Sequence, residues 1–310
     1  MSRVERVLVT GAAGFVGAAV TRQLIAEGRQ VAVLLRTPGV PRRLAQMMDS
    51  LHLVRGDLKR LDLVESQLRD FAPEGVVHLA WDGVKGADRN GPMQADNIAA
   101  SIALYRLSEA LTCRAFVGLG SQAEYGPAPG KLDEQAATRP TTVYGAAKLA
   151  TGLVLERSAA ATGRPFVWLR LFSSYGCDDD PSWLLQYLTR TLLAGQRPSV
   201  TAAEQRWDYI HVDDVASAVV AALDRGGRGI FNLGSGQAHP LRDVISQLRD
   251  LIDPSLDIGF GDLPYRPDQV MHLQADITAL QAATGWHPTV GLHEGLAQLV
   301  AWHRAQPVAT

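Results

Sequence analysis

Short apolar runs alternate with helical patterns along the first half of the chain. The apolar runs lie at residues 7–9, 31–35, 51–54, 76–80, 115–119 and 166–171. Helical spacing of apolar positions follows several of them, most clearly over residues 15–25, 97–111 and 143–161. Strands that are apolar on both faces and separated by helices are typical of a parallel sheet covered by helices. The pattern therefore predicts an α/β fold built on a Rossmann-type, doubly wound parallel sheet.

The character of the sequence changes after Gly176, where an acidic triplet at 178–180 precedes another helical pattern at 184–193. Residues 212–223 and 230–233 indicate a helix and a strand that return to the first sheet. We expect residues 1–176 and 208–235 to form the Rossmann domain, and residues 177–207 and 236–310 to form a smaller C-terminal α/β lobe.

Composition and charge narrow the classes of function. The 310 residues are 46% hydrophobic and 20% charged, which provides ample apolar surface for a globular core. A formal net charge of -2 gives no overall basic field to attract nucleic acid or an anionic membrane. We therefore expect neither as a partner, and any anionic ligand must be bound by local groups.

The cysteines and the N-terminal residues bear on location. Cys113 and Cys177 are the only cysteines, and neither has a partner at a C-x-x-C or metal-like spacing, so we expect no metal site. Two isolated thiols fit a reducing compartment. Charged residues lead from Met1 to Glu5 straight into the first strand pattern, and no long apolar segment follows. We expect a cytoplasmic protein.

A glycine-rich turn joins the first predicted strand to the first predicted helix. Gly11, Gly14 and Gly17 are spaced as G-x-x-G-x-x-G, and Phe15 and Val16 open the helix. Glycine permits a tight turn and a close approach of the backbone to a pyrophosphate, and the N-terminus of the helix offers N–H groups to it. Because the motif lies between a strand and a helix, it predicts a dinucleotide-binding site.

The residues after the second and third strands bear on the choice of cofactor. Arg36 ends the second strand, where an NAD-selective fold usually has a carboxylate for the ribose hydroxyls. Arg36, assisted by Arg42 and Arg43, could bind a 2'-phosphate, so we expect NADP(H), with NAD(H) as the alternative. The arginine could also stack on adenine or be a solvated charge. Asp57 could accept a hydrogen bond from the adenine amine or simply stabilise a turn.

Tyr144 and Lys148 lie one helical turn apart, on the same face of a predicted helix. A free phenol has a pKa of about 10 and exchanges protons poorly at neutral pH unless a nearby positive charge stabilises its anion. Lys148 could supply that charge. Ser121 precedes the pair at a distance that suits a loop over the same cleft, so the three residues are candidates for proton transfer.

At these residues the chain resembles the extended short-chain dehydrogenase/reductase family, in particular its nucleotide-sugar epimerase, dehydratase and reductase branch. The resemblance runs nearly from end to end. Besides the motifs above, it is carried by residues 56–58, 78–80, Asn97, 125–126, 170–172, 175–176, 208–215, 232–236, 266–268 and 285–288.

The resemblance implies a catalytic triad. Tyr144 would exchange a proton, Ser121 would hydrogen-bond the reacting oxygen, and Lys148 would hold the nicotinamide ribose and tune the phenol. With the patterns above, the implied cofactor contacts are Gly11, Gly14, Phe15, Val16, Gly17, Arg36, Asp57, Leu58, Leu79, Ala80, Tyr144, Lys148 and Phe172. The implied substrate contacts are Ser121, Gln122, Ala123, Ser173, Arg206 and Arg266, with the two arginines holding the phosphates of a sugar nucleotide.

Two departures from the family pattern concern the reaction. The 4,6-dehydratases of the family follow the serine with an Asp-Glu pair, whereas this chain has Gln122 and Ala123. Dehydration is therefore disfavoured, although Glu124 lies one position later and could face the cleft. Ser173 stands where many relatives have an asparagine that helps to hold the substrate.

Arg36 favours a reaction that consumes NADPH. We expect reduction of an NDP-4-keto-6-deoxyhexose, or a related keto sugar nucleotide, to the NDP-deoxysugar. The alternative is an NAD-dependent NDP-sugar 4-epimerase, which regenerates its NAD within each cycle. A non-catalytic dinucleotide sensor is a remote third hypothesis, because such proteins typically lack the tyrosine or the lysine.

The resemblance also implies a homodimer, in which the helices at 97–111 and 143–161 pair with their symmetry mates. The leucines of these helices, Leu104, Leu107, Leu111, Leu149 and Leu153, could equally pack on their own sheet. The sequence leaves the two possibilities open.

Overall fold

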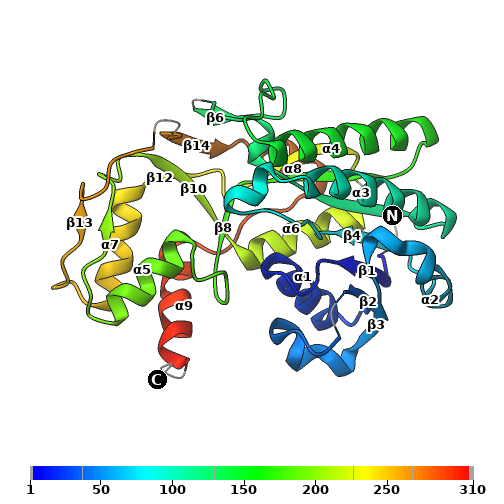
Figure 1. The fold of residues 1–310 in the computed structure, drawn as a ribbon, viewed down its shortest axis with the longest axis horizontal. Helices are drawn as coiled ribbons and strands as arrows, with labels where there is room; N and C mark the ends of the chain where they lie inside the picture. Colours follow the sequence, from blue (N-terminus) through cyan, green and yellow to red (C-terminus); the bar gives the residue numbers. More distant parts are fainter. Residues whose placement is uncertain (1–2, 37, 129, 226, 267–268, 307–310) are drawn as a thin grey trace.

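A seven-stranded parallel sheet forms the larger part of the computed structural model, which describes residues 3–36, 38–128, 130–225, 227–266 and 269–306 (Figure 1). In spatial order its strands are β11 (Gly229–Leu233), β7 (Val167–Leu171), β5 (Ala115–Ser121), β4 (Gly75–His78), β1 (Arg6–Thr10), β2 (Gln30–Leu35) and β3 (Leu51–Arg55). Neighbouring strands are parallel throughout. Each of the apolar runs above became one of these strands, so the predicted fold class is confirmed.

Helices cover both faces of this sheet. They are α1 (Phe15–Ala26), α2 (Glu65–Phe71), α3 (Met93–Ala110), α4 (Val143–Thr162) and α6 (Val212–Arg225), with short 3-10 helices η1 (Arg42–Ser50), η2 (Leu58–Leu63), η3 (Gly86–Asn90) and η4 (Gln122–Glu124). α1 packs against α6, and α3 packs against α4. Successive side chains of a strand point to opposite faces. Val7 and Val9 therefore join one apolar cluster with Val219, and Leu8 joins a second with Leu104.

The C-terminal lobe has a sheet of its own. Its strands are β12 (Ala238–Pro240), β10 (Arg206–His211), β14 (His272–Ala275) and β6 (Lys131–Leu132), with β8 (Ser173–Tyr175) also paired to β10 and a separate pair formed by β9 (Ser199–Val200) and β13 (Gly259–Phe260). The helices of this lobe are α5 (Leu184–Leu193), α7 (Leu241–Ile252) and α9 (Leu292–Ala305). The helix α8 (Thr278–Thr284) instead packs against β11 of the large sheet and against α6. Among the described helices none is long and apolar enough to cross a membrane.

The chain passes between the two sheets several times. α6 and β11 return to the large sheet as expected, since β11 pairs with β7. Residues 208–211, however, belong to β10: residues 209–211 pair with β8, and Asp208 pairs with Ala238 of β12. Residues 173–175 already belong to the second sheet as β8. The chain therefore enters the second sheet at β8, which precedes Gly176.

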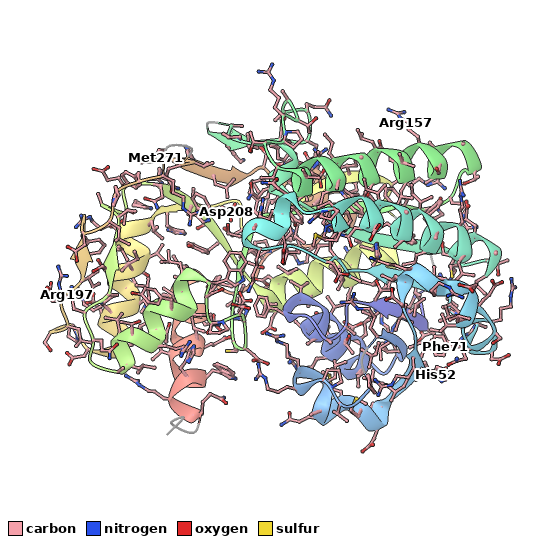
Figure 2. All side chains as sticks on the ribbon, in the orientation of Figure 1. His52, Phe71, Arg157, Arg197, Asp208 and Met271 are labelled. Carbon is pink, nitrogen blue, oxygen red and sulfur yellow. The ribbon has the colours of Figure 1, made fainter. Side chains whose placement is uncertain are left out.

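A buried aspartate, Asp208, holds the two sheets together at this crossing (labelled in Figure 2). Its carboxylate accepts hydrogen bonds from the Ser235 N–H and hydroxyl at 2.8 and 2.6 Å, from Gly236 N at 3.1 Å and from Ala275 N at 3.0 Å. These bonds tie β10 to the turn after β11 and to β14. A buried carboxylate needs such partners, because burial without them is strongly unfavourable.

Candidate active site

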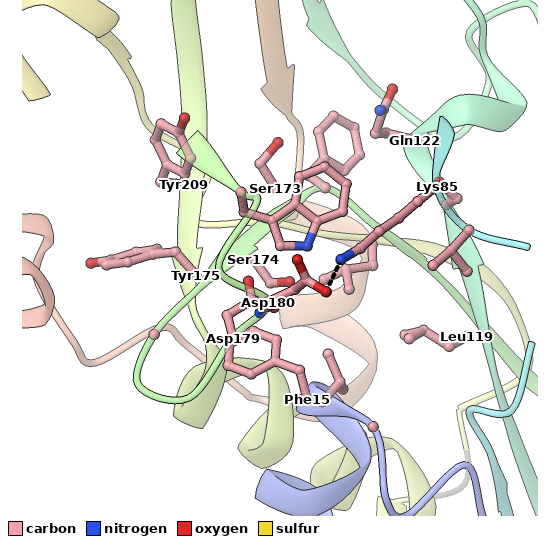
Figure 3. Close-up of a pocket in the computed structure, with 18 of the residues that line it drawn as sticks. Phe15, Lys85, Leu119, Gln122, Ser173, Ser174, Tyr175, Asp179, Asp180 and Tyr209 are labelled. Atoms are coloured by element: carbon pink, nitrogen blue, oxygen red, sulfur yellow. Dashed lines mark hydrogen bonds and ion pairs between the residues drawn. The ribbon is translucent and has the colours of Figure 1, made fainter. Parts of the chain in front are cut away.

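A cavity of about 730 Å³ lies at the carboxyl ends of the large sheet, between that sheet and the C-terminal lobe. Figure 3 shows that side chains from both parts face it: Phe15 and Leu119 from the large sheet side, and Ser173, Tyr175 and Tyr209 from the second sheet. Ligands of open α/β sheets bind at the carboxyl ends of the strands. The cavity is therefore in the position expected for the dinucleotide and its reaction partner.

The glycine turn forms one wall of the cavity, and its shape depends on missing side chains. Gly11 has a φ of +74°, and a Cβ there would lie 2.5 Å from the backbone nitrogen of Ala80. A Cβ on Gly17 would overlap the carbonyl oxygen of Gly11. Gly14 precedes α1 and contributes no side-chain cap. The first turn of α1 is thus presented to the cavity as backbone, which suits a pyrophosphate.

Tyr144 reaches the cavity from the first turn of α4. Thr142 caps the start of the helix, and its side chain accepts a hydrogen bond from Gly145 N at 3.1 Å. Burial raises the pKa of the Tyr144 phenol, and this rise is opposed by a hydrogen bond from the Ser121 side chain and by the positive charge of Arg89. The structure thus brings Tyr144 and Ser121 together, as the sequence predicted.

Lys148 lies one turn further along α4 and is buried. Its Nζ donates to the carbonyl oxygen of Leu119 at 2.6 Å and lies 3.8 Å from the centre of the Trp81 ring. Burial lowers the pKa of Lys148 to about 7, against the opposing influence of the Glu124 carboxylate. The Nζ group can donate hydrogen bonds to hydroxyl oxygens, which suits contact with a ribose in the cavity.

Arg89 is a functional candidate that the sequence analysis missed. It lies in η3, lines the cavity, and its guanidinium carbon is 4.5 Å from the centre of the Tyr144 ring. A cation over an aromatic face is attracted by the ring, and it also stabilises the phenolate form. No motif marks Arg89, because only the packing of the loop brings it to Tyr144. The same holds for Trp81.

Glu124 is turned away from the cavity. Its side chain is fully buried, and Oε1 accepts hydrogen bonds from Ser121 N at 2.9 Å and from Trp168 Nε1 at 3.0 Å. Its Oε2 accepts from Arg170 Nε at 2.8 Å. This carboxylate therefore holds the turn that carries Ser121 and does not face the cleft. In this position Glu124 could not act as an acid or base on a bound sugar.

Arg206, which was expected to contact the substrate, does not line the cavity. Because side chains alternate along β10, Gln205, Trp207 and Tyr209 line the cavity, whereas Arg206 lies on the other face and donates to the Ala238 carbonyl oxygen at 2.7 Å. Trp207 Nε1 donates to Ser173 Oγ at 2.6 Å. The period-two pattern of residues 205–209 was visible in the sequence and could have identified the inward-facing residues.

Charged side chains bridge the two lobes beside the cavity. Lys85, in the loop after β4, forms an ion pair with Asp180 (dashed in Figure 3). Arg43 donates to the Asp178 carbonyl oxygen at 2.9 and 2.8 Å, and Arg42 pairs with the Asp178 carboxylate. Arg42 and Arg43, expected to assist at a 2'-phosphate, thus bind the acidic triplet instead. Asp179 lines the cavity, and burial raises its pKa to about 6.

Most of the predicted contacts line the cavity. These are Gly11, Gly14, Phe15, Val16, Gly17, Leu79, Ser121, Gln122, Tyr144, Lys148, Phe172 and Ser173. The remaining predicted residues, Arg36, Asp57, Leu58, Ala80, Ala123, Arg206 and Arg266, do not line it in the part of the chain that the structure describes.

Several of these outlying residues have another place in the structure. The Asp57 carboxylate accepts a hydrogen bond from Lys59 N at 2.9 Å, so the turn-stabilising alternative is observed. Arg266 is exposed, and its motif partners Pro267 and Asp268 are outside the described residues. Within the described ranges no group of three or more His, Cys, Asp or Glu side chains could hold a metal ion.

Comparison with known proteins identifies relatives of this arrangement. The model of the NAD dependent epimerase/dehydratase family matches residues 7–234. A UDP-glucose 4-epimerase from Corynebacterium glutamicum is 29% identical over 304 residues, which cover 91% of this chain and 91% of that protein. Other curated relatives include a dTDP-glucose 4,6-dehydratase from Streptomyces niveus.

Solved structures of nucleotide-sugar epimerases are similar to this chain over nearly its whole length. A UDP-N-acetylglucosamine 4-epimerase from Methanobrevibacter ruminantium, in complex with UDP-N-acetylmuramic acid, superposes with a TM-score of 0.89 at 25% identity, covering 99% of this chain and 100% of that one. A Thermus thermophilus UDP-glucose 4-epimerase in complex with NAD superposes with a TM-score of 0.83 at 28% identity, covering 97% and 99%. The similarity therefore extends over both lobes.

Proposed function

We propose, from the premise that this chain belongs to the NAD dependent epimerase/dehydratase family, that it inverts carbon 4 of a nucleoside-diphosphate hexose with NAD as its cofactor. The single observation that carries this proposal is the cavity in which Tyr144, Ser121 and Lys148 meet beside the glycine turn. The relatives with 4-epimerase activity cover nearly the whole chain, which supports the same choice.

The residues of the cavity suit a proton shuttle at one sugar hydroxyl. The glycine turn and Lys148 would hold a nicotinamide dinucleotide, which would supply a reversible acceptor for the hydride of carbon 4. Tyr144 takes the proton of the 4-hydroxyl and gives it back, and Ser121 donates a hydrogen bond to the same oxygen. Inversion requires that the hydride return to the opposite face, so the sugar must turn over while Tyr144 holds the proton.

Dehydration is disfavoured by the residues around Ser121. Loss of water across a carbon–carbon bond needs an additional acid and base near the sugar. Gln122 lines the cavity but does not ionise, and Ala123 has no acidic group. Glu124 is engaged by Ser121 N and Arg170. These residues leave the Tyr144 shuttle without the partners that a 4,6-dehydratase would use.

A second candidate is the NADPH-dependent 4-ketoreductase expected from the sequence, and one residue favours it. Arg36 follows β2, at the place where a 2'-phosphate would be bound. We rank it below epimerisation because NAD is the cofactor named in the complexes of solved relatives. A non-catalytic sensor is less favoured still, because Ser121, Tyr144 and Lys148 are all present at the cavity.

The proposal also assigns a role to each lobe and includes a homodimer. The large sheet with its helices would hold the dinucleotide, and the smaller lobe would hold the nucleotide of the sugar. For the homodimer, α4 provides three exposed apolar side chains, Val143, Leu153 and Val154. Leu104 and Leu107 are buried in the core of their own subunit, so they are not available to a partner. A cytoplasmic location stays a prediction.

Incubation with a panel of UDP- and dTDP-hexoses and NAD, followed by chromatography of the sugar nucleotides, tests the function. We expect one substrate to reach a mixture of its two C4 epimers, without net NADH formation. In parallel, NDP-4-keto-6-deoxyglucose with NADPH is followed by the absorbance of the reduced nicotinamide. Steady NADPH consumption with no epimer formed from any hexose would replace the epimerase by the reductase.

A further inference from the structure

The conflict between Arg36 and the NAD-binding relatives has a structural resolution in Asp82. The guanidinium of Arg36 makes two hydrogen bonds to the Asp82 carboxylate, Nη1 to Oδ2 at 2.7 Å and Nη2 to Oδ1 at 2.9 Å. Arg36 follows β2, whereas Asp82 follows β4. Both strands neighbour β1, so the pair spans the edge of the sheet where the glycine turn begins.

The backbone of Asp82 is fixed independently of Arg36. Asn97, which is buried on α3, accepts a hydrogen bond from Asp82 N at 3.1 Å and donates to the Asp82 carbonyl oxygen at 2.9 Å. The position of the Asp82 backbone therefore does not depend on the bonds to Arg36. Two parallel bonds between a guanidinium and a carboxylate also fix the orientation of both groups.

We infer that Asp82 selects NAD over NADP by occupying Arg36 and by placing a negative charge beside the 2'-position of the adenosine ribose. This inference rests on the proposed binding of a nicotinamide dinucleotide. A 2'-phosphate carries a charge of about -2 and would have to displace the carboxylate from Arg36. It would then lie close to both groups, where the repulsion by Asp82 offsets the attraction by Arg36.

The ribose hydroxyls of NAD meet no such conflict. A neutral hydroxyl can donate to a carboxylate without breaking the ion pair, since a carboxylate oxygen accepts more than one hydrogen bond. In an NAD-selective fold this carboxylate usually stands at the end of the second strand. Here the loop after β4 supplies it, so a rule that inspects the residue after β2 alone predicts the wrong cofactor.

A second arginine makes the inference testable by a gain of binding. A hollow of about 400 Å³ beside the pair is lined by Arg36, Arg55 and Gly56 together with Pro38 and Gly39. Arg55 donates to the Gly39 carbonyl oxygen at 2.9 Å within it. Removing the negative charge of Asp82 leaves two arginines around this hollow, which suits a 2'-phosphate.

The test is a titration of the purified protein with NADH and with NADPH, followed by the fluorescence of the reduced nicotinamide. For the wild type we expect NADH to bind at least tenfold more tightly. Asp82→Asn keeps the size of the side chain and removes its charge. We expect it to tighten NADPH binding at least tenfold and to change NADH binding less than threefold. Adding Arg36→Gln to Asp82→Asn should abolish the gain.

Asp250→Asn is the matched control. Asp250 is an exposed carboxylate on α7 of the C-terminal lobe, and its Oδ1 lies 2.7 Å from the Arg249 guanidinium, so its loss changes the net charge equally but leaves Arg36 paired. The ratio of the two dissociation constants should not change in this variant. An unchanged ratio in Asp82→Asn, or a wild type that prefers NADPH, overturns the inference while leaving the proposed reaction open to its own test. A wild type that binds neither dinucleotide overturns both.

Discussion

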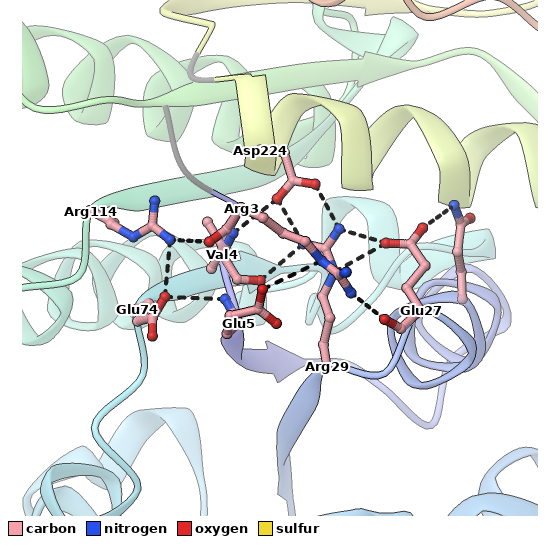
Figure 4. A network of polar contacts seen from close by, with 9 residues as sticks. Arg3, Val4, Glu5, Glu27, Arg29, Glu74, Arg114 and Asp224 are labelled. Carbon is pink, nitrogen blue, oxygen red and sulfur yellow. Dashed lines mark hydrogen bonds and ion pairs between the residues drawn. The ribbon is translucent and has the colours of Figure 1, made fainter.

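A buried arginine at the amino ends of the strands of the large sheet, the amino edge, is paired with carboxylates, whereas a buried lysine at their carboxyl ends, the carboxyl edge, is not. At the amino ends of the strands, Arg29 is buried, and its guanidinium lies 2.6 Å from carboxylates of both Asp224 and Glu27 (Figure 4). At the carboxyl ends, Lys148 is just as buried but forms no ion pair with any described side chain, and its pKa falls to about 7. Charges that are paired stabilise a fold, whereas charges held without a full partner are typical of sites that bind or react.

Other residues at the two edges show a similar difference between groups held in ion pairs and groups suited to react. At the amino edge Arg114 and Glu74 continue the network, with Arg114 Nη2 donating to Glu74 Oε2 at 3.0 Å. At the carboxyl edge the Tyr144 phenol is buried and has a raised pKa, with Arg89 over its ring. The same sheet thus separates a stabilising edge from a reactive edge, and each of the following substitutions tests one side of that difference.

The largest effect is expected from Tyr144→Phe. Removal of the hydroxyl eliminates the proton shuttle but leaves the ring and its packing, so turnover should fall about 10²- to 10⁴-fold. Binding of NADH, measured by titration, should change little. Tyr187→Phe is the matched control, because Tyr187 is on α5 and does not line the cavity. Comparable turnover in the two variants would contradict the role of Tyr144.

On the opposite edge, Asp224→Ala should be the most damaging to stability. It leaves the buried Arg29 with one carboxylate instead of two, and we expect a loss of about 3 kcal/mol in the free energy of unfolding. Denaturant titration measures it. Asp62→Ala breaks an exposed pair with Arg60 and should cost less than about 1 kcal/mol. Equal losses would show that burial of the pair has no special role.

Lys148→Met should stabilise the protein, in a way that depends on pH. The pKa of Lys148 is about 7 in the fold and its ordinary value is 10.5, so between these values the unfolded chain binds a proton that the folded chain does not. Wild-type stability therefore rises over this range, and the penalty of burial is greatest below pH 7. The variant should gain about 2 kcal/mol near pH 6, and this advantage should vanish toward pH 10.

Thermal or denaturant unfolding at several pH values measures this gain. Lys131→Met is the control, since Lys131 is exposed and its ammonium lies 2.9 Å from Asp276. That variant should show no stabilisation near pH 6. A gain for Lys148→Met that stays constant from pH 6 to pH 10 would argue against a lowered pKa in the fold.

The smallest effect is expected from Arg89→Gln. The charge of Arg89 lowers the pKa of the Tyr144 phenol, so its loss should raise that pKa and move the rise of kcat to higher pH. The pH profile of kcat measures the shift. Arg157→Gln, at an exposed position of α4 (labelled in Figure 2), is the control. Identical profiles for the two variants would remove Arg89 from the proton-transfer site.

Features set by neighbours in the sequence were predictable. The glycine turn, the spacing of Tyr144 and Lys148, and the strands of the large sheet can be read from short stretches of sequence. The structure places the turn between β1 and α1, the pair on α4 and the strands in one sheet. The alternation of side chains along a strand also bears on Arg206, which we expected to bind substrate from the family resemblance. The strand β10 must turn Arg206 and Trp207 to opposite faces, so the arginine could have been recognised as the outward-facing residue.

Features set by packing were not predictable. In the sequence, the strands β3 and β4 and the helix α2 lie between Arg36 and Asp82, and only the order of the strands in the sheet brings the two residues together. Arg89 and Trp81 reach the reactive pair through the path of one loop. The sequence left open whether Glu124 faces the cleft, and in the structure its carboxylate pairs with Arg170 of β7 in the core. These contacts depend on the tertiary fold and carry no local signature.

The fate of the hydrogen on carbon 4 tests the central claim most directly. UDP- and dTDP-glucose that carry deuterium at carbon 4 are incubated with the protein and unlabelled NAD, and the sugar nucleotides are analysed by NMR and mass spectrometry. We predict that the C4 epimer forms with deuterium still at carbon 4, because the same hydride leaves and returns within one cavity. The claim would be contradicted if no epimer formed while the protein reduced an NDP-4-keto sugar with stoichiometric consumption of NADPH.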